Sequence, residues 1–313
     1  MPVRIAVIGV GHLGQHHARI LASMADVSLV GVVDTKPGRA EEIGARYGVP
    51  GYADASAVID RVDAVSVAVP TVSHVEVALP FIDRGVAVLV EKPIAATVAD
   101  ADRLIAAAEA RDVVLAAGHT ERFNPAVAAA LPLVSRPRFV EVHRLGTFPE
   151  RSLDIDVIFD VMIHDLDLLL AAVPAEVTSI EAVGVNVLTP KTDIANVRLR
   201  FADGCIANLT ASRISRERVR KARFFQPESY ISIDYATQEV EVYRLLRTES
   251  AVASRPVIQG GKLEIAQQEP LAGELLDFVA AVRQHRAPGV TGRAGRAALA
   301  LAERVAAAIE ATV

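Results

Sequence analysis

The 313-residue sequence predicts an α/β domain with a doubly wound parallel sheet, followed by an α+β domain with an open, mostly antiparallel sheet. Two observations predict this fold. Short β-branched runs alternate with amphipathic helical segments up to about residue 117, and alternating strands joined by turns such as Ala202-Asp203-Gly204 dominate the later part. The length suits two ordinary domains, which we place at residues 1–120 and 121–313.

In the first domain the apolar runs are expected to be strands and the segments between them helices. Runs without polar alternation imply a parallel sheet that is covered on both faces. The expected strands are 3–9, 27–34, 64–70, 86–92 and 113–118, and the expected helices are 14–24, 36–48, 73–85 and 98–112.

The first strand–helix turn carries a complete GxGxxG motif, Gly9-Val10-Gly11-His12-Leu13-Gly14. Gly9 permits a tight turn, Gly11 lets a pyrophosphate approach the backbone, and Gly14 lets helix and strand pack closely. The helix N-terminus, including His12 and Leu13, offers free N–H groups and a positive dipole to the phosphates. The motif predicts a Rossmann dinucleotide site, and a glycine turn without a ligand is the alternative.

Asp34 ends the second strand at the spacing expected for a ribose-binding acid. Its carboxylate would accept hydrogen bonds from the ribose hydroxyls and repel a 2′-phosphate, so the expected cofactor is NAD, with NADP less favoured. Lys36 and Arg39 follow closely and would tolerate the phosphate. His16 and His17, on the next helix, are interpreted as surface or packing residues.

Ligands of such sheets bind at the carboxyl ends of the strands, so the residues there are candidates for the cofactor site. Pro70, Thr71 and His74 follow one strand, and Glu91 and Lys92 end the next. Pro93 favours an extended conformation for Lys92, which would direct its charge into the cofactor crevice. The alternative is a solvated loop lysine.

In the second domain, residues 156–173 predict a helix that is apolar on most sides. At 100° per residue, Asp156, Asp160, His164 and Asp167 share one narrow stripe, and Asp165 points elsewhere. Burying unpaired carboxylates is costly, so the stripe should line a wet cavity or face partners. Asp160 and His164, at i and i+4, form an orienter and a general base. The alternatives are an interdomain contact and a metal site, and no metal is assigned.

These motifs, in this order, resemble the glucose–fructose oxidoreductase/inositol dehydrogenase (Gfo/Idh/MocA) family over essentially the whole chain. The resemblance implies an N-terminal Rossmann domain and a C-terminal open sheet used for oligomerisation. It also implies catalytic roles for Lys92, Asp160 and His164, with Asp167 beside the substrate. Met162 stands where the family often has glycine, so the substrate side of the helix departs from the simple polyol dehydrogenases.

The stretches 118–125 and 160–168 resemble the branch that acts on UDP-N-acetylhexosamines, in particular the UDP-N-acetylglucosamine 3-dehydrogenases. This resemblance implies that Arg122 and Asn124 lie near the sugar. A basic run would then meet a diphosphate, or would instead form a solvated strand edge or a subunit contact. The run comprises Arg213, Arg216, Arg218, Arg220, Lys221 and Arg223.

The expected activity is oxidation of a secondary hydroxyl of a sugar, at C3 of a UDP-N-acetylhexosamine, by hydride transfer to the nicotinamide. His164 would take the hydroxyl proton, Asp160 would orient His164, and Lys92 would stabilise the developing alkoxide. The alternatives are a dehydrogenase or reductase for a free sugar, an inositol-like polyol or another small carbonyl substrate. More remote are a non-catalytic dinucleotide-binding sensor and a metal-dependent hydrolase.

The composition excludes some classes of binding partner and indicates the cellular compartment. Aromatic residues make up 4% of the chain and the net charge is −5, which argues against an aromatic-platform nucleic-acid binder. Cys205 is the single cysteine and indicates a reducing compartment. No apolar run reaches the ~18 residues of a membrane helix. We therefore expect a cytoplasmic protein that binds neither nucleic acid nor membranes. The family resemblance and the uncovered face of the C-terminal sheet imply a homodimer or homotetramer assembled through that sheet.

Overall fold

The computed structural model describes residues 1–148, 155–246 and 257–311, which form two units. Unit 1 comprises residues 1–122 and 269–299, and unit 2 comprises residues 123–268 and 300–313. The predicted boundary at 120/121 is close to the first division. The predicted C-terminal extent differs, because residues 269–299 group with the first unit instead of the second.

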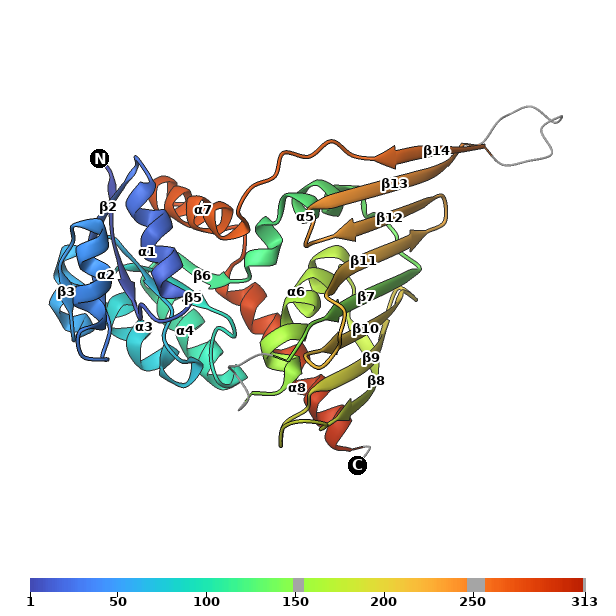
Figure 1. Cartoon of the computed structure of the whole chain (residues 1–313), viewed down its shortest axis with the longest axis horizontal. Helices are drawn as coiled ribbons and strands as arrows, with labels where there is room; N and C mark the ends of the chain where they lie inside the picture. Colours follow the sequence, from blue (N-terminus) through green and yellow to red (C-terminus); the bar gives the residue numbers. More distant parts are fainter. Residues whose placement is uncertain (149–154, 247–256, 312–313) are drawn as a thin grey trace. The chain divides into compact units, whose positions relative to one another are not determined.

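Unit 1 contains a six-stranded, all-parallel sheet in the order β3-β2-β1-β4-β5-β6, with helices along its connections (Figure 1). This strand order is that of a Rossmann fold, which confirms the predicted α/β class. The strands are β1 (Val3–Ile8), β2 (Val27–Val33), β3 (Gly51–Tyr52), β4 (Ala64–Val67), β5 (Ala87–Glu91) and β6 (Leu115–Gly118). The helices are α1 (Gly14–Ser23), α2 (Arg39–Tyr47), α3 (His74–Asp83), α4 (Val98–Ala110) and α7 (Pro270–Gln284).

The helix α7 belongs to unit 1 because its apolar side completes the core on one face of the parallel sheet. Leu275, Phe278 and Val279 are buried in the same cluster as Ile5 of β1 and Leu21 of α1. Proline at the first position of α7 suits a helix start, where no backbone N–H partner is needed. The sequence places α7 far from β1 along the chain, so only the fold reveals this packing.

Unit 2 contains an eight-stranded sheet in the order β14-β13-β12-β11-β7-β10-β9-β8. Every neighbouring pair is antiparallel except β7 and β10, which confirms the predicted open, mostly antiparallel sheet. The strands are β7 (Phe139–Leu145), β8 (Val177–Val185), β9 (Ile194–Phe201), β10 (Ile206–Ser212), β11 (Val219–Gln226), β12 (Ser229–Asp234), β13 (Glu239–Leu246) and β14 (Val257–Lys262).

One face of this sheet is covered and the other is open. Apolar side chains alternate along the strands, as in β9, where Val197 and Leu199 are buried and Arg198 and Arg200 are exposed. Helices α5 (Pro125–Ala130) and α6 (Ile163–Ala172) lie on the covered face (Figure 1). The last helix, α8 (Gly292–Glu310), contributes its first residues to unit 1 and its last residues to unit 2.

Candidate active site

The glycine motif of unit 1 has the local geometry that its sequence predicts. Gly9 has φ +85°, and a Cβ there would lie 2.8 Å from the Ala68 carbonyl oxygen. At Gly14 a Cβ would lie 1.8 Å from the Gly9 carbonyl oxygen, so any side chain would separate the helix from the strand. At Gly11 a Cβ would meet nothing within 4 Å, which leaves space for a phosphate to approach the backbone.

Asp34 holds the same loop from the end of β2. Its Oδ2 accepts the Val10 N–H at 2.9 Å and its Oδ1 accepts the Lys36 N–H at 2.9 Å. A hollow of about 630 Å³ opens beside it, at the place where the adenosine end of a dinucleotide would fit. The hollow is lined by Gly11, His12, Asp34, Lys36, Pro37, Gly38, Arg39 and Glu42.

The contacts of Arg39 favour NAD over NADP. Its Nε donates to the Val10 carbonyl oxygen at 2.9 Å, and its Nη1 forms an ion pair with Glu42 at 3.0 Å. A guanidinium already engaged in this way, beside two carboxylates, is poorly placed to neutralise a 2′-phosphate. The tolerance for NADP that Arg39 suggested in the sequence is therefore weaker in the structure.

The end of β4 presents Pro70 at the surface and Thr71 half-buried, at the carboxyl edge of the sheet. His74, one turn later, is buried, and its Nδ1 and Nε2 lie 2.9 Å from the Pro93 and 3.0 Å from the Val69 carbonyl oxygens. Burial lowers the pKa of His74, although both carbonyls and the charge of Glu91 oppose this shift. The ring thus supports the backbone around Pro93, and its predicted contact with the cofactor stays a prediction.

Lys92 follows β5 at the same edge of the parallel sheet as the glycine loop and the end of β4. Its side chain is half-buried, whereas the preceding Glu91 is buried. The peptide bond between Lys92 and Pro93 is cis. One edge of unit 1 therefore presents a candidate phosphate loop, a ribose-binding acid and a lysine.

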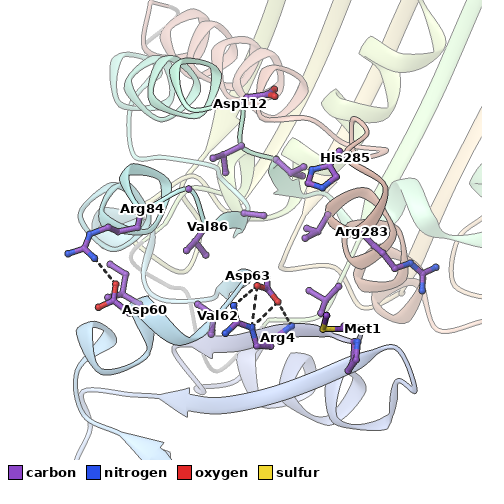
Figure 2. A pocket seen from close by; sticks show the side chains of 18 residues that line it. Met1, Arg4, Asp60, Val62, Asp63, Arg84, Val86, Asp112, Arg283 and His285 are labelled. Carbon is purple, nitrogen blue, oxygen red and sulfur yellow. Dashed lines mark hydrogen bonds and ion pairs between the residues drawn. The ribbon is translucent and has the colours of Figure 1, made fainter.

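A second hollow in unit 1, of about 940 Å³, lies at the opposite end of this sheet (Figure 2). Val62, Asp63 and Val86, which precede β4 and β5, line it, and Arg4 pairs with Asp63 at its floor. Ligands of parallel α/β sheets bind outside the carboxyl ends of the strands, so this hollow is not a candidate for the cofactor site.

In unit 2 the predicted catalytic helix begins as a π-helical segment, Ile158–Met162, and continues as α6. Hydrogen bonds to the fifth residue widen the turn, so the predicted stripe at 100° per residue does not apply before Ile163. Asp160, inside the π-helical segment, and His164, just after it, are both half-buried. π-Helical turns occur frequently at functional sites, which supports a site here.

The other two members of the predicted stripe are placed differently from Asp160 and His164. Asp167 is fully buried. Asp156 is half-buried, and its Oδ1 accepts the backbone N–H of Thr192 at 2.7 Å, so it holds a neighbouring loop. Asp156 therefore leaves the predicted stripe, because the helix widens between Asp156 and His164 and the Asp156 carboxylate accepts a backbone N–H. Asp167 lies one turn after His164 in the regular helix α6, and its place beside the substrate stays a prediction.

Asp165 forms a buried ion pair. Arg144 of β7 donates from Nε and Nη2 to its two carboxylate oxygens, both at 2.7 Å, and both residues are almost fully buried. The Arg144 guanidinium also lies over the ring of Tyr235, 5.2 Å from its centroid. The sequence interpretation missed this pair, although Arg144 takes an inward position in the alternating pattern of β7, a signal from which a buried partner follows.

The two predicted sugar contacts, Asn124 and Arg122, lie in different surroundings. Asn124 is buried at the N-cap of α5, where its Oδ1 accepts the Ala126 N–H and its Nδ2 donates to the Tyr235 carbonyl oxygen, both at 3.0 Å. These contacts give Asn124 a structural role, and its predicted contact with the sugar stays a prediction. An asparagine directly before a proline is a known helix-start signal, which the sequence interpretation missed. Arg122 is half-buried at the end of the first part of unit 1.

The basic run is not a single surface patch. Arg213 is buried and its Nε donates to Asp193 at 2.8 Å, whereas Lys221 pairs with Asp234 and Arg223 with Glu141. Arg216, Arg218 and Arg220 are exposed. The run as a whole therefore does not form a diphosphate site.

The buried carboxylate of Asp193 is held by hydrogen bonds from backbone N–H groups. Its Oδ2 accepts the N–H groups of Val187, Leu188 and Thr189 at 2.7–2.9 Å. Burial alone would raise the pKa of Asp193, but these donors hold it well below its usual range. Because Arg213 also donates to the Ile155 carbonyl oxygen at 2.6 Å, this cluster anchors the chain that enters the π-helical segment.

Within the described residues, no three histidine, cysteine, aspartate or glutamate side chains gather as a metal-binding group. Over the same residues, no helix is both long enough and apolar enough to span a bilayer. Cys205 is buried, and burial raises the pKa of its thiol to about 11, which keeps it protonated and unreactive.

Comparison with known families assigns both parts of the chain. Residues 3–119 match the oxidoreductase family with an NAD-binding Rossmann fold (GFO_IDH_MocA). Residues 134–231 match the GFO/IDH/MocA C-terminal domain.

Individual relatives extend over the full length. The UDP-N-acetylglucosamine 3-dehydrogenase of Acidithiobacillus ferrooxidans is 40% identical over 99% of this chain and 98% of its own. The crystal structure of that enzyme, GnnA, superposes with a TM-score of 0.92 at 39% identity, covering 99% of this chain and 98% of the other. An inositol 2-dehydrogenase of Rhizobium meliloti is 28% identical over 97% of this chain and 96% of its own.

Proposed function

Because the chain belongs to the GFO/IDH/MocA family of NAD-binding oxidoreductases, we propose that it oxidises the C3 hydroxyl of a UDP-N-acetylhexosamine with NAD. The observation that carries the substrate proposal is the likeness to UDP-N-acetylglucosamine 3-dehydrogenase along the whole chain. That likeness includes the unit that holds Asp160 and His164, and it is stronger than the 28% identity to the inositol 2-dehydrogenase over 97% of this chain.

The residues of unit 1 fit NAD. The open space at Gly11 and the carboxylate of Asp34 would hold the pyrophosphate and the adenosine ribose, and the engaged guanidinium of Arg39 is poorly placed to bind a 2′-phosphate. When bound, NAD supplies the hydride acceptor. Thr71 and Lys92, at the neighbouring strand ends, are candidates for contacts with the rest of the cofactor.

In the proposed reaction the side chains move a proton and stabilise charge. His164 accepts the proton of the reacting hydroxyl, and Asp160 orients the imidazole. Lys92 donates a hydrogen bond that stabilises the alkoxide charge as it develops. We also keep Arg122 as a candidate for binding the sugar nucleotide.

We propose that the enzyme assembles as a homodimer or homotetramer through the open face of the unit 2 sheet. Four aromatic side chains form an in-register row across β7, β11, β12 and β13 on that face: Phe139, Phe225, Tyr230 and Tyr243. Phe225 and Tyr243 are each 37% exposed. Such a row suits burial against a second copy, and light scattering of the wild type and of Tyr243→Glu tests it.

A cytoplasmic location is proposed from the single reduced cysteine.

The testing experiment combines thermal shift with absorbance at 340 nm. NAD and NADP are each added with UDP-N-acetylglucosamine, with UDP alone, or with myo-inositol. A rise at 340 nm that needs both NAD and the UDP-sugar supports the proposal. If NAD stabilises the protein but no UDP-sugar gives a response, the proposed dehydrogenase activity stands, and the proposed substrate becomes a free sugar or a polyol. No effect of either dinucleotide would overturn the proposed cofactor site.

A further inference from the structure

His17 of α1 is buried without exposed surface, and both of its ring nitrogens meet polar side chains. Its Nδ1 lies 2.8 Å from Oγ of Ser66, on β4, and its Nε2 lies 3.0 Å from Oε1 of Glu91, at the end of β5. This histidine therefore links three elements of unit 1, in contrast to the surface or packing role that its sequence suggested.

Glu91 connects His17 to the backbone of Lys92. Its second oxygen, Oε2, accepts the backbone N–H of Lys92 at 3.2 Å. Across the sheet, a Cβ on Gly118 would lie 2.9 Å from Cα and 3.1 Å from Oε2 of Glu91, so a larger residue there would displace the carboxylate. The carboxylate is thus confined between α1 and β6, directly beneath the backbone of the lysine.

The charge state of Glu91 fixes the direction of these hydrogen bonds. Burial alone would raise the pKa of Glu91, but the hydrogen bond and charge of His17, together with the charge and N–H of Lys92, lower it. Glu91 is then a carboxylate, which only accepts, so Nε2 of His17 must carry the donated proton. The contact with Ser66 holds the other side of the ring.

We propose that His17 is a positioning residue that acts through Glu91 to hold Lys92 in its reactive position. The inference rests on the proposed catalytic role of Lys92. His17 also lies one turn after Gly14, on the helix that begins at the glycine loop. The same side chain therefore ties the backbone of the lysine to the element that would carry the cofactor phosphates.

The test is a double-mutant cycle between His17→Leu and Lys92→Ala, measured as kcat and KM on UDP-N-acetylglucosamine with NAD. His17→Leu should lower kcat on the order of 10²-fold, the effect expected of a displaced catalytic group, while the Kd of NAD changes little. In the Lys92→Ala background the same substitution should change the residual kcat by less than about threefold, because there is no lysine left to position.

Two further variants separate positioning from mere stability. His17→Gln keeps an N–H donor of similar reach toward Glu91 and should restore most of kcat, which also covers the case that His17→Leu folds poorly. Leu21→Ala, on the buried side of the same helix, removes packing without touching Glu91. It should lower Tm while leaving kcat of the folded enzyme within about twofold.

The outcomes distinguish the two proposals. If Lys92→Ala lowers turnover but His17→Leu lowers only Tm, or if the two effects multiply, the positioning role is overturned and the role of Lys92 stands. If Lys92→Ala leaves turnover intact, the catalytic role of Lys92 falls, and the positioning role falls with it.

Discussion

The two units place their candidate catalytic residues beside buried acids, but they support them in different ways. In unit 1, Glu91 precedes Lys92 and pairs with His17, a residue that can lose its charge. In unit 2, Asp165 follows His164 and pairs with Arg144, which stays charged at every pH a protein experiences. Both acids are buried, and neither side chain is proposed to touch the substrate.

The difference concerns what each pair holds. The carboxylate of Glu91 grips a single backbone N–H at a strand end, so it fixes one residue. The bidentate pair of Asp165 joins α6 to β7, so it fixes the rotation of the helix that carries His164. A change in the position of Lys92 therefore needs only a local movement, whereas a change in the position of His164 involves the whole helix α6 and its sheet.

The largest expected effect is on stability, from breaking the pair in unit 2. Asp165→Asn leaves the Arg144 guanidinium buried without its counter-charge and should lower the free energy of unfolding by about 3–5 kcal/mol. Glu91→Gln should lower it less, because an imidazole, unlike a guanidinium, need not carry a charge. Urea unfolding of both variants measures the contrast.

The apolar replacement of the same pair provides the control. Arg144→Met combined with Asp165→Leu removes both charges of the pair and should recover most of the stability lost in Asp165→Asn. Equal losses for Asp165→Asn and Glu91→Gln would contradict the distinction drawn between the two units.

The next effect is on turnover. Lys92→Ala and His164→Ala should each lower kcat at least ~10²-fold, or about 2.7 kcal/mol of transition-state stabilisation, because each removes a group that acts as the proton leaves. The Kd of NAD, measured by fluorescence titration, should change little in either variant. Intact turnover in one variant would remove that residue from the proposed reaction.

A smaller effect depends on pH and concerns the loop that anchors the π-helical segment. The pKa of Asp193 is depressed in the folded protein, so its contribution to stability is present above its unfolded pKa of about 3.9 and is lost as the pH falls through the folded value. Asp193→Asn should therefore destabilise by about 2 kcal/mol at pH 7, and the gap to the wild type should shrink below about pH 4. Urea midpoints at pH 7, 5 and 3.5 measure the gap, and a gap independent of pH would show that the charge of Asp193 contributes nothing.

The sequence predicted the fold correctly and singled out the candidate residues one by one, because both depend on local patterns. Strand and helix periods, the glycine spacing and Asp34 are all readable within about 25 residues of one another. The supporting contacts are not, since Ser66 and Glu91 lie 49 and 74 residues from His17. The widened helical turn before His164 has no such pattern in the sequence, so the position of Asp156 could not be derived from a regular helix.

The smallest expected effect is on cofactor binding, and it tests whether unit 1 recognises NAD as its contacts suggest. Asp34→Ala removes the acceptors for the ribose hydroxyls and also releases the N–H groups of Val10 and Lys36, so the Kd of NAD should rise about tenfold, or about 1.4 kcal/mol. NADP should be affected less, because the variant also loses a charge that repels its phosphate.

Glu42→Gln is the matched variant, since it frees Arg39 without touching the ribose acceptor, and it should improve NADP binding while leaving that of NAD nearly unchanged. An unchanged NAD affinity in Asp34→Ala would mean that the glycine loop alone holds the cofactor, and that the carboxylate serves only to shape the loop.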